Sequence, residues 1–278
     1  MKIARVFPRR TNATPDDPLA FIGMPDLLTP EWFDEVHISV AFTYDMPLVD
    51  KLAEAWIMRT GRLKIGGPGT GMRGEEFQPG MYLKKGYVIT SRGCPNDCWF
   101  CTVPEREGDI RELEIHAGWN VLDDNLLACS KEHITKVFKM LMKTKKVLHK
   151  PVEFTGGLEA RLLGHWHCEW FYKLKPKQIF FACDTSEDAI WLSIAGDMLN
   201  MHNISKESRR CYVLCGYADD TFEKAEYRMK RTIDSGFIPM AMVYKDEKGI
   251  YNKEWTGFQK EWTRPAIMRV KGLLKLLH

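Results

Sequence analysis

Three cysteines lie within eight residues, in the segment Cys94-Pro-Asn-Asp-Cys98-Trp-Phe-Cys101. The segment 87–91, Tyr-Val-Ile-Thr-Ser, lies just upstream, and its β-branched and aromatic residues predict a short buried strand. The cysteines are therefore expected on the loop that leaves this strand. Gly93 and Pro95 would allow that loop to curl back, so that three sulfur atoms face one point.

Three thiolates at this spacing suit an iron–sulfur cluster. A [4Fe–4S] cluster normally takes four cysteine ligands, so three would leave one iron open to another molecule. Structural zinc usually takes four protein ligands in two closely spaced pairs, and it remains an alternative. A disulfide network is a third option, but the sequence shows no secretory signal. The other five cysteines are dispersed, which argues against an obvious second cluster.

The CxxxCxxC spacing, with the aromatic Phe100 before the last cysteine, resembles the signature of the radical S-adenosylmethionine (radical SAM) superfamily. In that family the open iron is chelated by the amino and carboxylate groups of S-adenosylmethionine. A low-potential electron then cleaves the sulfonium to methionine and a 5′-deoxyadenosyl radical, which abstracts hydrogen from a substrate. The resemblance implies a [4Fe–4S] cluster on Cys94, Cys98 and Cys101, with S-adenosylmethionine as the second cofactor. It also implies an electron donor such as flavodoxin or ferredoxin.

The composition sets broad limits on the function. The chain has 278 residues, 45% hydrophobic and 28% charged, as in an ordinary globular protein with one large domain or one domain and an appendage. No apolar run approaches the roughly 18 residues of a membrane span, and the first residues lack the apolar core of a signal peptide. We therefore expect a cytoplasmic protein without a membrane partner. The net charge of +3 neither requires nor excludes nucleic acid, so the substrate stays open among a peptide, a small metabolite and a nucleic acid.

Residues 1–80 are expected to form a small Rossmann-like region. A strand is predicted at 35–42, a helix at 47–59 and a second strand at 62–65, followed by the glycine-rich turn 66–71. This stretch resembles a shortened cobalamin-binding domain of the kind that precedes the barrel in many radical SAM enzymes. The Asp-x-His-x-x-Gly motif of that domain is absent, so we do not expect cobalamin to bind. A plain loop is favoured over a phosphate site for the glycine turn.

Residues 81–245 alternate strands and helices. After the first strand, further strands are predicted at 120–123, 152–155, 178–183, 211–215 and 237–244, and helices from Ser130 to Pro151 and at 158–173, 186–199 and 221–235. Right-handed βα units would curl these strands into a partial (βα)6 TIM-like barrel, which is the fold that the resemblance implies. The crossover 104–118 fits a small extra strand about as well as a helix. In the C-terminal extension, 246–278, a basic helix at 264–275 is expected to pack on the barrel through Ile267, Val270, Leu274 and Leu277.

Functional groups of parallel barrels gather at the carboxyl ends of strands. The resemblance places Phe100 and the end of the fifth strand, Gly216, beside adenine. Asp123-Asp124-Asn125 would receive the methionine ammonium, Glu159 the ribose hydroxyls and Arg161 the methionine carboxylate. Asp184 ends the fourth strand. Each residue also has an ordinary structural alternative: core filling, the first turn of a helix, a surface ion pair or a helix cap.

Two further groups attract attention but are expected to be structural. His165-Trp166-His167-Cys168 resembles a metal cluster at first sight, but neighbouring residues on a helix point about 100° apart, so adjacent ligands do not converge. Cys183, Cys211 and Cys215 fall on predicted strands and are expected to be small core residues. The alternative to an enzyme is a non-enzymatic iron–sulfur or zinc-binding protein.

Overall fold

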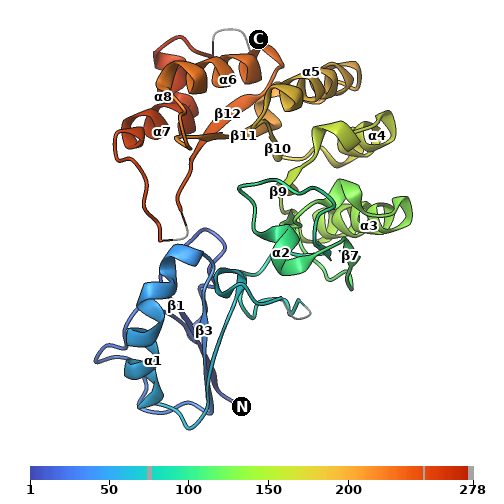
Figure 1. Cartoon of the computed structure of the whole chain (residues 1–278). Coiled ribbons are helices and arrows are strands. Elements are labelled where there is room, and N and C mark those ends of the chain that lie inside the picture. Colours follow the sequence, from blue (N-terminus) through green and yellow to red (C-terminus); the bar gives the residue numbers. More distant parts are fainter. Residues whose placement is uncertain (74–76, 247, 275–278) are drawn as a thin grey trace. The chain divides into compact units, whose positions relative to one another are not determined.

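The computed structural model describes residues 1–73, 77–246 and 248–274. The chain forms two compact units (Figure 1). The first contains residues 1–88, 93–109 and 246–250, and the second contains residues 89–92, 110–245 and the C-terminal segment from Tyr251. The cysteine segment therefore groups with the N-terminal region, whereas the sequence analysis placed it with the barrel that begins at residue 81.

The first unit is built on a four-stranded sheet in the order β2-β1-β3-β4, with every strand parallel to its neighbours. The predicted strand, helix and second strand are present as β3 (Glu35–Ser39), α1 (Val49–Ile57) and β4 (Leu63–Gly66), with a short 3-10 helix (Thr43–Leu48) before α1. The strands β1 (Ile3–Phe7) and β2 (Ala20–Ile22) were not predicted.

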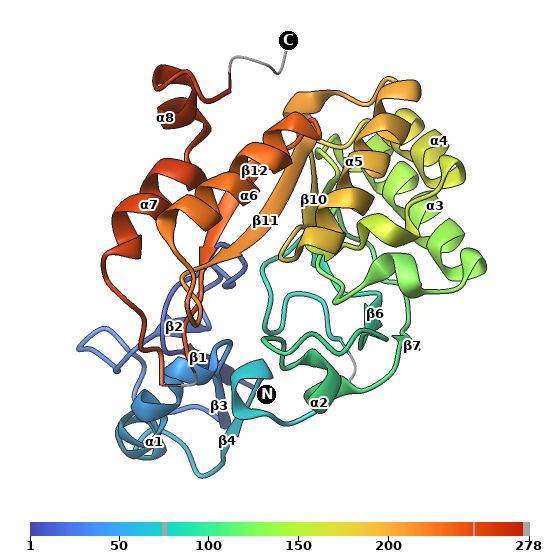
Figure 2. The same cartoon turned by 45° about the horizontal axis from the view of Figure 1, so that its top comes forward.

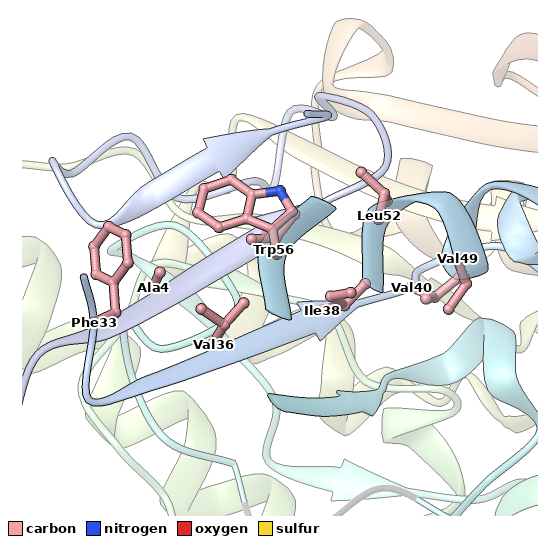
Figure 3. Close-up of a cluster of buried hydrophobic side chains, with 9 residues drawn as sticks. Ala4, Phe33, Val36, Ile38, Val40, Val49, Leu52 and Trp56 are labelled. Atoms are coloured by element: carbon pink, nitrogen blue, oxygen red, sulfur yellow. The ribbon is translucent and has the colours of Figure 1, made fainter. Parts of the chain in front are cut away.

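The core of this unit lies between α1 and one face of the sheet (Figure 3). Alternate residues of β3, such as Val36 and Ile38, point to this face, because side chains in a strand alternate between its two sides. α1 contributes Val49, Leu52 and Trp56, which recur at helical spacing and are almost fully buried. The Trp56 indole also donates a hydrogen bond to the Gly23 carbonyl, 3.0 Å away, so that its polar atom is satisfied.

The other face of the same sheet is polar. Glu35 and His37 alternate with the apolar residues of β3, and both are buried. Arg5 of β1 donates to the carbonyl oxygens of Gly80 (2.9 Å) and Met81 (3.1 Å). Side-chain-to-backbone hydrogen bonds therefore attach the segment around Gly80 to the sheet.

The glycine turn after β4 is explained by close packing within the first unit. Gly67 has φ +105°, and a Cβ atom there would lie 2.5 Å from the Val40 carbonyl oxygen. A Cβ atom on Gly69 would lie 2.5 Å from the carbonyl oxygen of Phe42. Backbone approaches this close admit only glycine, so the turn has a structural reason for its composition.

The second sheet has six strands in the order β12-β11-β10-β9-β8-β5. The predicted strands are found, with bounds β5 (Tyr87–Val88), β8 (Asn120–Val121), β9 (Glu153–Leu158), β10 (Gln178–Ala182), β11 (Arg209–Cys215) and β12 (Ile238–Val243). The pairings from β8 to β12 are parallel and follow chain order. The predicted mixed α/β architecture with a largely parallel sheet is thus confirmed.

Four helices connect these strands and gather on one side of the sheet (Figure 2), as right-handed crossovers between sequential strands require. They are α3 (Lys131–Leu148), α4 (His165–Leu174), α5 (Ser186–Met201) and α6 (Phe222–Asp234). The Ser130 hydroxyl caps α3 by accepting from the backbone N–H of His133, 3.1 Å away, as predicted.

The helix predicted at 158–173 is wrong in its first part. β9 continues to Leu158, which pairs with Phe181 of β10 and is almost fully buried there. A 3-10 turn (Ala160–Leu162) follows, and Gly164 is the N-cap of α4. The apolar Leu158 is thus buried by strand pairing rather than by a helical face.

The crossover 104–118 contains both elements that the sequence left open. The short helix α2 (Val103–Glu107) is followed by β7 (Arg111–Glu112), which pairs antiparallel with β6 (Ser91–Arg92). The small extra strand is therefore present.

The C-terminal extension differs from its prediction. It holds α7 (Trp255–Thr263), which packs along β12, and α8 (Pro265–Val270). The helix expected to reach residue 275 ends at Val270, whose side chain is 90% exposed, and Gly272 adopts φ +74°. Leu274 is buried as expected, whereas Leu277 lies outside the described residues. None of the helices in the described ranges is both long enough and apolar enough to cross a membrane.

Candidate functional site

The cysteine loop is held at both ends by backbone contacts within the first unit. Gly93 has φ +89°, and a Cβ atom on it would lie 2.2 Å from the Asp109 carbonyl oxygen, so only glycine fits. The Cys94 N–H donates to the Gly108 carbonyl at 3.2 Å, and the Cys101 N–H donates to the Cys98 carbonyl at 2.8 Å. These contacts define a curled loop that leads directly into α2.

The three thiols of this loop are free of disulfide bonds. Cys94 and Cys101 are half-buried and Cys98 is exposed. Over residues 1–73, 77–246 and 248–274, no three His, Cys, Asp or Glu side chains are grouped so that they could hold a metal ion. The donor set still fits an iron–sulfur cluster, because it offers three accessible thiols on one loop. Metal sites often form only when the metal binds, so the ligands need not converge beforehand.

Phe100 follows the exposed Trp99, and the two rings meet edge to face at 5.3 Å between centroids. Phe100 is half-buried, whereas Trp99 is 64% exposed. A contact of Phe100 with adenine stays a prediction.

Asp123, at the end of β8, is tied to the segment that leads toward the cysteines. Its carboxylate accepts from the Thr90 N–H (2.6 Å), the Thr90 hydroxyl (2.5 Å) and the Ser91 hydroxyl (2.8 Å). Burial raises the pKa of Asp123 to about 6, although these hydrogen bonds oppose the rise. The residue therefore joins two strand ends of the second unit, which no local sequence signal indicated.

Asp124 lies beside Arg92, with 3.7 Å between the guanidinium nitrogen and the carboxylate oxygen. Both side chains are largely buried, at 11% and 17% exposure. The pair connects the end of β8 to β6, the strand that precedes the cysteine loop in the chain. The negative charge of Asp124 thus lies near a fixed cation.

Three of the predicted site residues come together. The Asn125 amide donates to Glu159 Oε2 at 2.7 Å, and Arg161 Nε donates to Glu159 Oε1 at 2.8 Å. A second guanidinium nitrogen of Arg161 lies 2.6 Å from the same oxygen. The sequence analysis proposed these residues separately; the structure joins them through Glu159, whose side chain is 14% exposed.

The two glycines of β9 have different environments. A Cβ atom on Gly156 would lie 2.3 Å from the Asp123 carbonyl oxygen, whereas one on Gly157 would meet nothing within 4 Å. Only Gly157 therefore leaves open space beside its backbone, because the neighbouring strand end occupies the space that a side chain would need at Gly156.

Asp184 bridges two strands instead of capping the next helix. Its Oδ1 accepts from the Leu214 N–H of β11 at 2.7 Å, and burial raises its pKa to about 6. The cap of α5 is Thr185, whose hydroxyl accepts from the Asp188 N–H at 3.1 Å. The helix-cap alternative for Asp184 is therefore wrong.

Gly216, at the end of β11, has φ +76°, and its N–H donates to the Asp220 carboxylate at 2.9 Å. A Cβ atom there would lie 3.0 Å from the indole ring of Trp255, which is 5% exposed. Trp255 begins α7 and was not named as a site residue. Its spacing with Phe258 and Trp262, at i, i+3 and i+7, was the available helix signal.

The remaining candidates have separate partners. His165 Nδ1 lies 3.1 Å from His202 Nε2, and His167 Nδ1 accepts from the Gly164 N–H at 3.0 Å. Cys168 is buried, so these neighbours do point in different directions. Cys183, Cys211 and Cys215 are buried on or beside their strands, as predicted, and burial raises the pKa of each thiol.

No protein-family model matches this chain, and no curated protein matches it. Any functional assignment must therefore rest on the residues themselves, namely the cysteine loop and the polar groups at the carboxyl ends of the second sheet.

Proposed function

We propose that this chain is a radical SAM enzyme that holds one [4Fe–4S] cluster through Cys94, Cys98 and Cys101. The observation that carries the proposal is the trio of cysteines at spacings of four and three residues on one loop, none of them in a disulfide. They lie on a loop that begins at Gly93, directly after β6 and five residues after β5, the edge strand of the six-stranded sheet. A structural zinc site would need a fourth protein ligand.

The cysteines would bind as thiolates, each to a different iron, and would leave the fourth iron without a protein ligand. When bound there, S-adenosylmethionine supplies a 5′-deoxyadenosyl radical after one-electron reduction. The reductant would be a low-potential donor of the flavodoxin or ferredoxin class, and the substrate is not specified by these residues. Backbone contacts of Cys94 and Cys101 fix the two ends of the loop while the exposed Cys98 remains accessible.

The Asn125–Glu159–Arg161 network would position the nucleoside part of S-adenosylmethionine. Glu159 holds both the amide of Asn125 and the guanidinium of Arg161, so it sets the direction of each. The carboxylate of Glu159 would accept from ribose hydroxyls, and Arg161 would offer the guanidinium N–H groups that do not face Glu159 to the methionine carboxylate. Asp124 would supply a negative charge for the methionine ammonium.

Gly216 would present its backbone to adenine. Its positive φ turns the chain away from β11, and the Trp255 ring packs on the side where a Cβ atom would stand. Asp220 holds the Gly216 N–H and is itself paired with Arg228 at 2.7 Å. These contacts would keep the strand end rigid, which is what a backbone-recognition site requires.

The test is anaerobic reconstitution with iron and sulfide, followed by reduction in the presence of S-adenosylmethionine. The proposal predicts about four iron atoms per chain and formation of 5′-deoxyadenosine and methionine. Replacement of Glu159 by Gln is expected to leave the iron content unchanged but to reduce the rate of cleavage about tenfold or more, because one charged acceptor is lost.

The same experiment distinguishes the proposed enzyme from the alternative, a non-enzymatic iron–sulfur or zinc-binding protein. A chain that binds one zinc ion, or that binds iron but never produces 5′-deoxyadenosine with a competent reductant, would be a metal-binding protein without this activity. Either outcome would reject the proposed enzyme.

A further inference from the structure

A row of lysines runs along the outer face of α3. Lys136, Lys139, Lys143 and Lys146 are separated by three, four and three residues, so they share one side of the helix. All four are exposed. The opposite face of α3 is buried and apolar, with Ile134, Val137, Phe138 and Leu141 in the core. The row extends over about 15 Å at 1.5 Å per residue, and Lys150 follows just after the helix.

The charge of the whole chain is concentrated here. Residues 131–150 contain seven lysines and one acidic residue, Glu132. The rest of the chain has 33 basic and 36 acidic residues, and is therefore net negative when histidine is neutral. The overall charge of +3 thus arises from one helix and the turn that follows it.

Folding alone does not favour this arrangement. Like charges three or four residues apart destabilise a helix by about 0.2–0.5 kcal/mol per pair. The helix dipole favours cations in the last turn, which accounts for Lys145 and Lys146 but not for Lys139 or Lys143. Lys136 pairs with Glu132 at 2.7 Å, whereas Lys139, Lys143 and Lys146 form no ion pair with any described residue.

A second group of lysines lies beside the end of this row. Lys145 Nζ donates to the Leu174 carbonyl at 2.5 Å, which joins the C-terminal ends of α3 and α4. Figures 1 and 2 both show these two helices side by side. Lys173 and Lys175 are exposed around this junction, whereas the exposed Lys177 pairs with Glu153 at 2.9 Å. The cationic surface therefore continues from α3 onto the end of α4.

Aromatic rings are interleaved with these cations. The Lys150 ammonium lies 5.7 Å from the ring centroid of Trp119, and the Lys173 ammonium lies 5.3 Å from that of Trp170. Both rings are half-buried. Clustered lysines with adjacent aromatic faces are the combination that binds nucleic acids, through phosphate contacts and base stacking.

We propose that the lysine surface, defined as Lys139, Lys143, Lys146, Lys150, Lys173 and Lys175, binds the backbone of a nucleic acid. On α3, Lys139 to Lys146 extend over about 10 Å at 1.5 Å per residue, so these lysines can face successive phosphates along one strand. The surface adjoins the amino ends of β9 and β10, whereas Glu159 and Asp184 follow their carboxyl ends. This binding goes beyond the proposed function and does not depend on cluster chemistry.

The test measures binding of a fluorescent single-stranded RNA of about 20 nucleotides to the full chain by anisotropy, across a salt series, with and without reconstituted iron. The triple change Lys139→Glu, Lys143→Glu and Lys146→Glu is expected to weaken binding at least tenfold. It is also expected to make the plot of log affinity against log salt shallower by about 2, at about 0.7 per lost phosphate contact. Circular dichroism checks that α3 remains folded.

A matched control reverses three exposed lysines elsewhere, Lys51, Lys253 and Lys260, for the same change of net charge. It is expected to keep binding within about twofold. Equal loss in both triple variants would overturn the proposal, because net charge and not this surface would then govern binding. Binding of polyglutamate, or of vesicles rich in phosphatidylserine, as tightly as RNA would overturn it too. So would the absence of RNA binding by the unmodified chain at low salt.

Discussion

The carboxyl ends of the two parallel sheets have different surroundings. In the first unit, β4 leads into a turn whose glycines touch the backbone of Val40 and Phe42. In the second unit, the strand ends carry Asp123, Glu159 and Asp184, and each carboxylate is held by a named donor. The first sheet thus uses its strand ends for close packing, and the second uses them to place polar groups.

The pKa of one buried carboxyl in the first unit and those of two buried carboxyls in the second unit are shifted in opposite directions. Glu35 of the first unit contacts His37, Arg62 and Lys64, and these partners lower its pKa to about 2. Asp123 and Asp184 of the second unit are buried among mostly neutral donors, and burial raises the pKa of each to about 6. Buried carboxyls with raised pKa values are more typical of functional sites than are carboxylates neutralised by ion pairs.

The largest effect is expected from Gly156→Ala. The new Cβ atom would lie 2.3 Å from the Asp123 carbonyl, so β8 and β9 would have to separate. We expect a loss of about 3 kcal/mol in the stability of the second unit, measured by hydrogen exchange of β8 and β9 peptides. Gly157→Ala is the matched control and is expected to cost less than about 1 kcal/mol. Equal costs would show that these strand ends are not closely packed.

The change Asp184→Asn tests whether burial raises the pKa of the Asp184 carboxyl. The carboxyl of Asp184 has a folded pKa of about 6, above the ordinary 3.8, so its contribution to stability is present at low pH and is lost as pH rises through 6. The amide keeps the acceptor for the Leu214 N–H but does not ionise. Relative to the unmodified chain, the variant is therefore expected to gain about 3 kcal/mol between about pH 4 and pH 7, measured by hydrogen exchange of β10 and β11 peptides.

Glu35→Gln is the counterpart in the first unit, with the opposite sign. The lowered pKa of Glu35 means that its stabilising contribution is present above about pH 4.5 and is lost as pH falls toward 2. The variant is expected to be less stable than the unmodified chain at neutral pH. Its free energy of unfolding is also expected to fall less steeply as the pH decreases from about 4.5 toward 2. A difference between the two chains that persists unchanged down to about pH 2 would contradict the ion-pair explanation.

A smaller effect is expected from Tyr82→Phe. The Tyr82 hydroxyl lies 2.7 Å from His37 Nδ1, and the side chain is 40% exposed. Loss of this hydrogen bond is expected to cost about 1 kcal/mol, seen as faster hydrogen exchange in β3 and the segment around Gly80. The exposed Tyr172 of the second unit provides a control, because its change to Phe is expected to have almost no effect on β3.

Much of the second sheet could be predicted because its strands are short apolar runs between turn residues, as in 178–183 and 211–215. The first two strands of the chain were missed, since Ile3–Phe7 is short and borders basic residues, and β2 has only three residues. The helix α7 was not predicted, although Trp255, Phe258 and Trp262 recur at helical spacing.

The candidate site was predicted as separate residues, not as a network. Spacing along the chain identified Asn125, Glu159 and Arg161, because each follows a strand. Their mutual hydrogen bonds span up to 34 positions, and no local pattern determines such pairings. The same holds for Asp123 and Thr90, which are 33 residues apart.

The most direct test of the central claim is the iron content of Cys98→Ala after anaerobic reconstitution, compared with Cys129→Ala, which removes a thiol outside the loop. We expect about four iron atoms per chain in the Cys129 variant and less than about one in the Cys98 variant, because two remaining thiols do not retain a [4Fe–4S] cluster. Retention of most of the iron by Cys98→Ala, or equal losses in both variants, would contradict the assignment of the three cysteines as cluster ligands.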